Sequence, residues 1–143
     1  MDYKTLEKKH GLPAGLKQSF DLPDDCKSLH EARKKAAEHL DTYIQYLEGL
    51  LQSETSFANV YECKLFNDDD KKRVFSAYKH LMLLSRTALE LGLDNDPAKD
   101  LSYLKHALEA WQGVKEELKE IFNKVKAAWQ EESEPGDSPG YFG

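Results

Sequence analysis

The chain has few cysteines, no long apolar run and no glycine-rich phosphate loop. Its two cysteines, Cys26 and Cys63, are too few for a disulfide framework, and neither has the nearby second cysteine of a zinc site. We expect two reduced thiols rather than one bridge. The longest apolar run, residues 81–84, is far shorter than a membrane span, and residues 1–15 lack the apolar core of a signal peptide. These absences predict a cytoplasmic protein with no membrane segment.

The net charge of −6 is concentrated rather than spread along the chain. Glu132, Glu134 and Asp137 lie in residues 132–143, which contain no Lys or Arg, and two further aspartates lie in the turn at residues 94–96. The rest of the chain is close to neutral, with both signs mixed along the expected helices. This distribution disfavours a dominant basic face of the kind that binds nucleic acid.

Hydrophobic periodicity predicts an all-α fold with three long helices, at about residues 28–53, 68–91 and 97–131. The first begins at Ser28, where Glu31 completes a capping box. The second ends at Gly92, which we expect to be a left-handed C-cap, and Pro97 occupies the first position of the third. The apolar stripe of the second helix, which includes Phe75 and Leu89, is wide enough to be covered on two sides, so we expect a central position for it.

The third helix carries an apolar seam spaced alternately by three and four residues and broken only at Lys115. Its members are Leu101, Leu104, Leu108, Trp111, Leu118, Phe122, Val125 and Trp129. A period near 3.5 implies nearly parallel helix axes, and the short connection at residues 93–96 implies opposite directions for the helices it joins. The sequence therefore predicts an elongated antiparallel bundle. Gly113 interrupts this helix, either because another backbone approaches closely or for no structural reason.

The chain divides by composition into an N-terminal arm (1–27), a helical bundle (28–131) and an acidic tail rich in Pro and Gly (132–143). The arm contains a short helical pattern at residues 3–10, followed by an irregular stretch whose apolar residues we expect to dock on the bundle. Residues 54–67 fit either a short helix or an extended connection. The tail cannot hold a helix.

No metal centre or cofactor is predicted. A helical di-metal site needs Glu-x-x-His pairs on facing helices, and the sequence offers only Glu7 with His10 and, in reverse order, His106 with Glu109. No second inward pair completes four ligands. Neither cysteine lies in a nucleophile elbow or a thiol-protease signature. We therefore expect a protein that is not an enzyme.

One pattern supports a catalytic alternative. Arg73 and His80 are seven residues apart, which places them on nearly one face of the second helix. An arginine followed by a histidine on a helix of an all-α domain resembles the motif of the HEPN ribonucleases. That resemblance implies RNA cleavage at a dimer interface, with Arg73 and His80 carrying it. The sequence departs from the motif at Val74, where HEPN proteins usually have a polar residue.

A second alternative is a small helical subunit of a nucleic-acid complex. It would use the short basic runs at residues 33–35 (Arg33, Lys34, Lys35) and 71–73 (Lys71, Lys72, Arg73). An ordinary solvated helix face is the explanation that we favour for both runs.

The aromatic residues support the reading that we favour, a protein-interaction or assembly subunit. Trp111 lies in the middle of the seam, where core packing is the expected role of a tryptophan. Trp129 lies near the helix end, past the point where we expect the other helices to stop, and Tyr141 and Phe142 follow the acidic residues. We predict that Trp129, Tyr141 and Phe142 contact a protein partner or a second copy of the chain.

Overall fold

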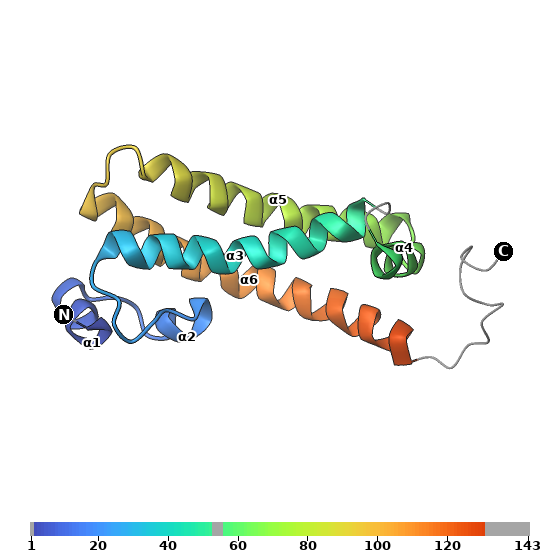
Figure 1. Cartoon of the computed structure of the whole chain (residues 1–143), viewed down its shortest axis with the longest axis horizontal. Coiled ribbons are helices and arrows are strands. Elements are labelled where there is room, and N and C mark those ends of the chain that lie inside the picture. Colours follow the sequence, from blue (N-terminus) through green and yellow to red (C-terminus); the bar gives the residue numbers. More distant parts are fainter. Residues whose placement is uncertain (1, 53–55, 131–143) are drawn as a thin grey trace.

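The structure is a computed structural model that describes residues 2–52 and 56–130. Within these residues it contains six α-helices and no strand, so the predicted all-α class is confirmed (Figure 1). The helices are α1 (Tyr3–His10), α2 (Leu16–Phe20), α3 (Leu29–Leu51), α4 (Phe57–Lys64), α5 (Asp68–Leu91) and α6 (Pro97–Gln130).

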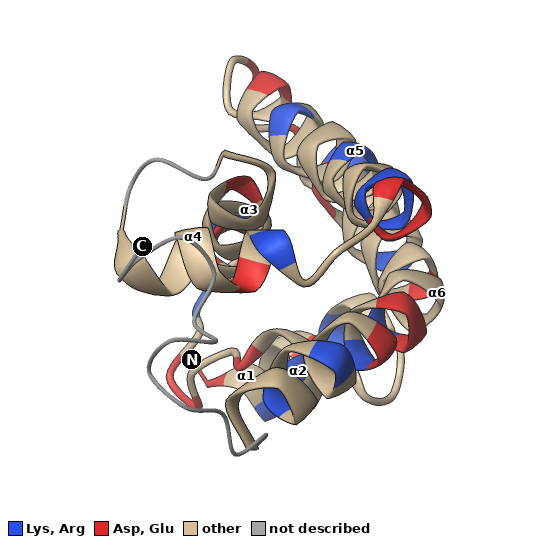
Figure 2. Ribbon diagram, turned by 90° about the vertical axis from the view of Figure 1, so that its right-hand side faces the viewer, with Lys and Arg blue, Asp and Glu red and all other residues tan. Residues whose placement is uncertain are grey.

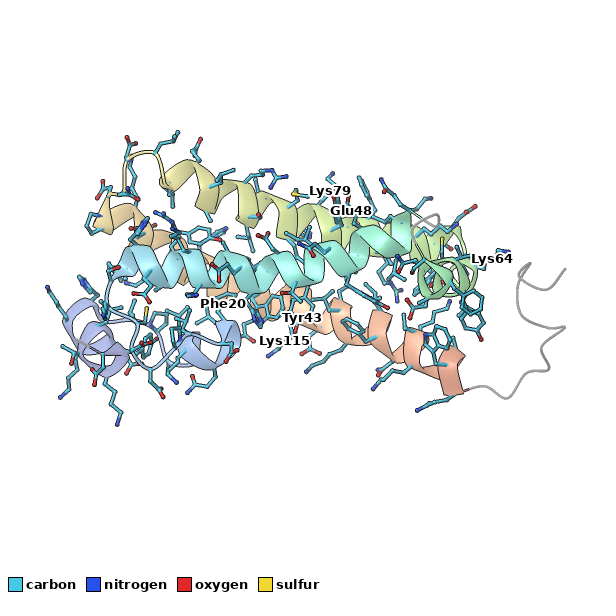
Figure 3. All side chains as sticks on the ribbon, in the orientation of Figure 1. Phe20, Tyr43, Glu48, Lys64, Lys79 and Lys115 are labelled. Carbon is cyan, nitrogen blue, oxygen red and sulfur yellow. The ribbon has the colours of Figure 1, made fainter. Side chains whose placement is uncertain are left out.

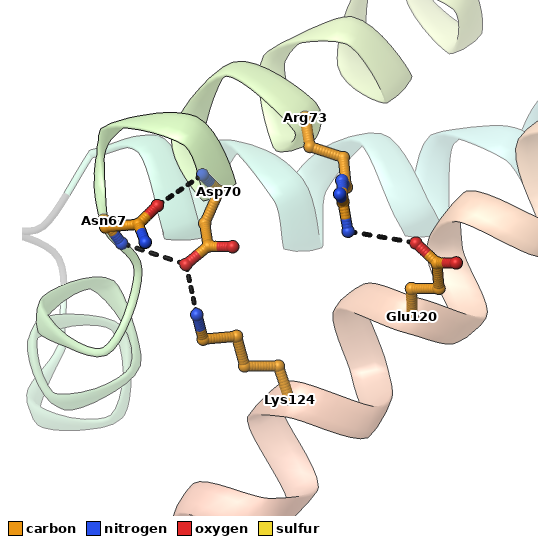
Figure 4. A network of polar contacts seen from close by, with 5 residues as sticks. All are labelled: Asn67, Asp70, Arg73, Glu120 and Lys124. Atoms are coloured by element: carbon orange, nitrogen blue, oxygen red, sulfur yellow. Dashed lines mark hydrogen bonds and ion pairs between the residues drawn. The ribbon is translucent and has the colours of Figure 1, made fainter.

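The three longest helices, α3, α5 and α6, each contact the other two, and α6 extends along most of the molecule (Figure 1). Three polar contacts join α5 to α6. The hydroxyl of Tyr103 donates to the Leu84 carbonyl at 2.9 Å, Arg73 pairs with Glu120 at 3.0 Å, and Lys124 pairs with Asp70 (Figure 4). The residue numbers on α6 therefore increase along the contact while those of their partners on α5 decrease.

Local hydrogen bonds fix where the long helices begin. Ser28 Oγ accepts from the Glu31 amide at 3.0 Å, as predicted, but Glu31 Oε2 accepts from the Lys27 amide at 3.1 Å instead of completing the box with Ser28. At the start of α5, Asn67 and Asp70 form a complete capping box, with bonds of 2.8 and 3.0 Å (Figure 4). Each cap satisfies amides that the first turn of a helix leaves unpaired.

The predicted left-handed cap at Gly92 is wrong. Gly92 has φ of −64°, in the right-handed helical region, and its amide donates to the Leu89 carbonyl at 3.1 Å, so the right-handed turn continues past Leu91. The left-handed residue of this connection is Asn95, with φ of 52°. Asparagine tolerates that conformation better than most residues because its short polar side chain can bond locally.

The core is one cluster that the N-terminal helices share with the long ones. Leu12, Leu16, Phe20 and Leu22 are all buried in it, and the stretch expected to be irregular contains helix α2. By contrast, no element that the structure describes covers the outer side of α5, where Phe75 is 50 % and Leu89 71 % exposed. The expectation that the wide apolar stripe of α5 is covered on two sides, with α5 central in the bundle, is therefore wrong among the described helices.

An aromatic cluster connects α2, α3 and α6. The rings of Phe20 and Trp111 have centroids 6.0 Å apart, and the His39 ring lies beside both, at 6.1 and 5.8 Å; Figure 3 labels Phe20 and the neighbouring Tyr43. Trp111 is only 5 % exposed, which confirms its predicted core role. Burial lowers the pKa of His39, while Asp21 acts in the opposite direction.

Gly113 lies on α6 with open space around it. A Cβ atom added there would meet no heavy atom within 4 Å among the residues that the structure describes. The alternative in which another backbone approaches this glycine closely is therefore wrong.

A buried ion pair joins α3 to α6. Arg33 Nη1 lies 2.6 Å from Asp100 Oδ1, and the two residues are only 2 % and 1 % exposed. Arg33 Nη2 also donates to Nδ1 of His30 at 2.9 Å. Both charges are thus withdrawn from water, and each depends on the other for compensation.

Candidate partner-binding site

The C-terminal end of α6 is covered in part by α4. Ser56 caps this short helix by accepting from the Asn59 amide at 3.1 Å, so the helical alternative is correct for Phe57–Lys64, within the described part of residues 54–67. The Tyr61 hydroxyl donates to the Ala128 carbonyl at 3.1 Å, and its ring lies 4.5 Å from that of Trp129, centroid to centroid. The expectation that Trp129 lies past the ends of the first two long helices did not include α4, whose Tyr61 lies against it.

Glu62 is the polar centre of this contact. It is only 6 % exposed, and its two carboxylate oxygens accept from Trp129 Nε1 at 2.7 Å and from the Tyr46 hydroxyl at 3.2 Å. Burial, together with the charge of Glu62, raises the pKa of Tyr46. The Tyr46 ring in turn stacks on Phe122 at 5.0 Å. These bonds fix the orientation of the Trp129 indole, because a buried carboxylate is stable only with its acceptors satisfied.

The outer side of this contact presents aromatic surface. Trp129 is 48 % and Phe57 42 % exposed, and the Phe57 ring lies 6.4 Å from that of Tyr61. We call Phe57, Tyr61 and Trp129 together the α4–α6 aromatic surface. A shallow depression lies on the same end of α6, lined by Leu65, Lys124, Ala127, Ala128 and Gln130. Large aromatic side chains that are held in place and half exposed are typical of protein contact sites.

Of the three predicted contact residues, the structure places Trp129. Tyr141 and Phe142 lie outside the described residues, so their role stays a prediction. Sequence reasoning missed Phe57, Tyr61 and Glu62. The only available signal was the group of aromatic residues within a segment whose helical state was itself undecided.

The residues of the ribonuclease alternative lie on the exposed side of α5. Arg73 Nη1 donates to Glu120 Oε2 at 3.0 Å (Figure 4). His80 lines a cleft of about 540 Å³ with Lys72, Phe75, Ser76, Lys79 and Leu83, to which Arg73 does not contribute. The HEPN-like activity stays a prediction.

The two basic runs differ in their surroundings. Lys71, Lys72 and Arg73 are all exposed on α5. Arg33 is instead buried against Asp100, so the expectation that it contributes to a surface patch with Lys34 and Lys35 is wrong. Its neighbours in sequence gave no indication of this, because the compensating carboxylate lies on another helix.

The other candidate groups give no catalytic arrangement. Cys26 and Cys63 are both buried free thiols, and burial raises the pKa of Cys26. Within residues 2–52 and 56–130, no three His, Cys, Asp or Glu side chains gather as a metal site would require. None of the helices that the structure describes combines the length and apolar character needed to cross a bilayer.

Comparison of the chain with family models, with curated proteins and with solved structures gives no match.

Proposed function

We propose that this protein is a non-enzymatic interaction or assembly subunit, and that its partner binds on the α4–α6 aromatic surface. The supporting observation is the Glu62 carboxylate, which holds the indole of Trp129 at 2.7 Å while 48 % of that residue stays exposed. An aromatic side chain that is already ordered loses little conformational entropy when a partner covers it.

In this proposal α3, α5 and α6 form an elongated antiparallel bundle that serves as a rigid support. The pairing of Tyr103 with Leu84 near one end and of Lys124 with Asp70 near the other favours that arrangement. Helix α4 packs against the C-terminal end of α6, so the surface proposed for the partner is formed by two helices. The partner is a protein, because tryptophan and tyrosine dominate the binding energy of protein interfaces. A cytoplasmic location stays part of the proposal.

The test is affinity purification of the full chain from its native cells, followed by quantitative mass spectrometry. Trp129→Ala and Phe57→Ser remove the two half-exposed aromatic residues, and Leu93→Ser is the matched control, since Leu93 is 82 % exposed outside this surface. We expect one protein to be retained by the wild type and by Leu93→Ser. Both aromatic variants should weaken its binding by a factor of about 30, the effect of a hot-spot residue.

Thermal unfolding of each variant shows whether its fold survives. The proposal fails if no retained protein is sensitive to both aromatic substitutions. It also fails if binding is lost only in a variant that is unfolded at the temperature of the experiment.

A further inference from the structure

The outer face of α5 carries large apolar side chains that no described residue covers. Phe75 is 50 %, Leu83 66 % and Leu89 71 % exposed. At 100° per residue these three positions fall within an arc of about 120°, on the side of α5 away from its buried positions. Single exposed apolar residues are normal in soluble proteins, and three of them on one helix face give an apolar surface that a ligand can cover.

Basic residues lie in the same arc. Lys72, Lys79 and Arg86 are exposed within it, and two exposed acidic residues, Asp68 and Glu90, share the arc close to the two ends of α5; Figure 2 shows residues of both signs on this helix. The Lys79 ammonium lies 5.9 Å from the centroid of the Phe75 ring. Neither Lys72 nor Lys79 forms an ion pair with any residue that the structure describes. This outer face, defined by the apolar and basic residues just named, therefore fits a ligand that is both acidic and apolar.

The chain itself contains such a segment. Residues 131–143 hold Glu131, Glu132, Glu134 and Asp137, no Lys or Arg, and then the adjacent aromatics Tyr141 and Phe142. We propose that residues 131–143 bind the outer face of α5 in the same molecule. The carboxylates pair with Lys72, Lys79 and Arg86, and the two aromatic rings lie beside Phe75 and Leu83.

The segment is long enough to reach this face. Because Lys124 pairs with Asp70, the end of α6 at Gln130 lies about 17 Å along the axis from Phe75 and about 29 Å from Leu83, at 1.5 Å per residue. The eleven residues from Glu131 to Tyr141 span up to about 36 Å when extended. That length exceeds the axial distance to Phe75 by about 19 Å, more than the width of a helix (about 10 Å), and exceeds the axial distance to Leu83 by about 7 Å.

Tethering makes a weak contact sufficient. A short linker holds its two ends at an effective concentration in the millimolar range, so a segment with millimolar affinity as a free peptide is bound for much of the time when attached. Exposed ion pairs contribute little individually, and their attraction falls as salt is added. The proposal gives Tyr141 and Phe142 a site within the molecule, and it does not depend on the partner proposed for the α4–α6 aromatic surface.

The test uses NMR spectra of the full chain. At low salt we expect nuclear Overhauser effects from the rings of Tyr141 and Phe142 to the methyl groups of Leu83. The double variant Tyr141→Ser with Phe142→Ser should shift the amide signals of α5 between Lys72 and Leu83. These signals should keep their wild-type positions when the wild-type protein is diluted tenfold, because the contact is intramolecular.

Charge reversal gives a second, matched test. Lys72→Glu with Lys79→Glu should lower the fraction bound at least about threefold, and adding Glu132→Lys with Glu134→Lys should restore it. Lys99→Glu with Lys105→Glu changes the net charge equally on exposed positions of α6 and should leave the contact intact.

Several results would overturn the proposal. Shifts confined to α4, absence of any α5 shift, or failure of the reversed charges to restore binding would each show that the segment does not occupy this face. Shifts that disappear on dilution would make a second copy the occupant. Binding to phosphatidylserine vesicles that needs Lys72 and Lys79, with α5 signals insensitive to Tyr141 and Phe142, would make a membrane surface the occupant.

Discussion

Replacing Asp100 by asparagine is expected to be among the most damaging conservative changes in this chain. The substitution keeps the size of the side chain but removes the charge that compensates Arg33, which lies 2.6 Å away and is only 2 % exposed. The guanidinium then remains buried without a counter-charge. Removing one partner of a buried ion pair typically lowers the free energy of unfolding by about 3–5 kcal/mol.

That loss is large relative to the stability of a single domain. Domains of this size unfold with about 5–15 kcal/mol. For a chain of 143 residues the predicted loss corresponds to a fall in Tm of roughly 10–20 °C. Urea unfolding, followed by the helical circular dichroism signal at about 222 nm, measures the free energy of unfolding. An m-value equal to that of the wild type shows that both proteins expose the same surface on unfolding.

Two further variants separate charge burial from simple loss of packing. Arg33→Met with Asp100→Leu removes both charges, and it should recover most of the stability that Asp100→Asn loses, since apolar replacement of a buried pair is often neutral. Glu116→Gln breaks an exposed pair with Lys119, 3.3 Å apart, and should change the free energy by less than about 1 kcal/mol.

The reasoning is refuted by either of two results. One is an Asp100→Asn protein whose free energy of unfolding lies within about 1 kcal/mol of the wild type, which would mean that Arg33 is solvated or finds another partner. The other is a double variant that is no more stable than Asp100→Asn alone.

Three other predictions concern single residues. Burial lowers the pKa of His39 in the folded protein, whereas in the unfolded chain this histidine has its ordinary pKa of about 6.5. The unfolded chain therefore binds more protons below about pH 6.5, so the stability that depends on neutral His39 is fully present above that pH and is lost as the pH falls through the lower folded pKa. His39→Phe should therefore flatten the dependence of the urea midpoint on pH between about 7.5 and 5, and an unaltered profile would contradict this. Gly113→Ala should raise the free energy of unfolding by about 0.5–1 kcal/mol, since the added methyl group meets open space, and a decrease would show that the space is occupied. Ser28→Ala should lower it by about 1 kcal/mol through loss of the bond to the Glu31 amide, and an unchanged Tm would argue that water replaces the cap.

The positions of the long helices could be predicted because their signals are local. Ser28 and Asn67 cap amides within three residues of themselves, and Pro97 needs only its own ring to favour the first turn. The error at Gly92 was local too. A glycine at a helix end permits a left-handed turn without requiring one, and the chain made its turn at Asn95.

The candidate site was predictable only in part, because its contacts join distant segments. The position of Trp129 at the end of a helix was visible in the sequence, but the helix against which it packs was not. Arg33 was misassigned for a related reason. A basic residue in a basic run suggests a solvated face, and nothing near it in sequence reveals Asp100.

The contacts that join the early helices to α6 also set an order of events during synthesis. Arg33 with Asp100, Tyr61 with Ala128 and Glu62 with Trp129 are each separated by 67 residues. A ribosome that adds about 5–20 residues per second needs about 3–13 s to make such a length, whereas a helix forms in about a microsecond. Arg33 and Glu62 are therefore synthesised seconds before the α6 residues that pair with them, and the last third of the chain decides when the fold closes.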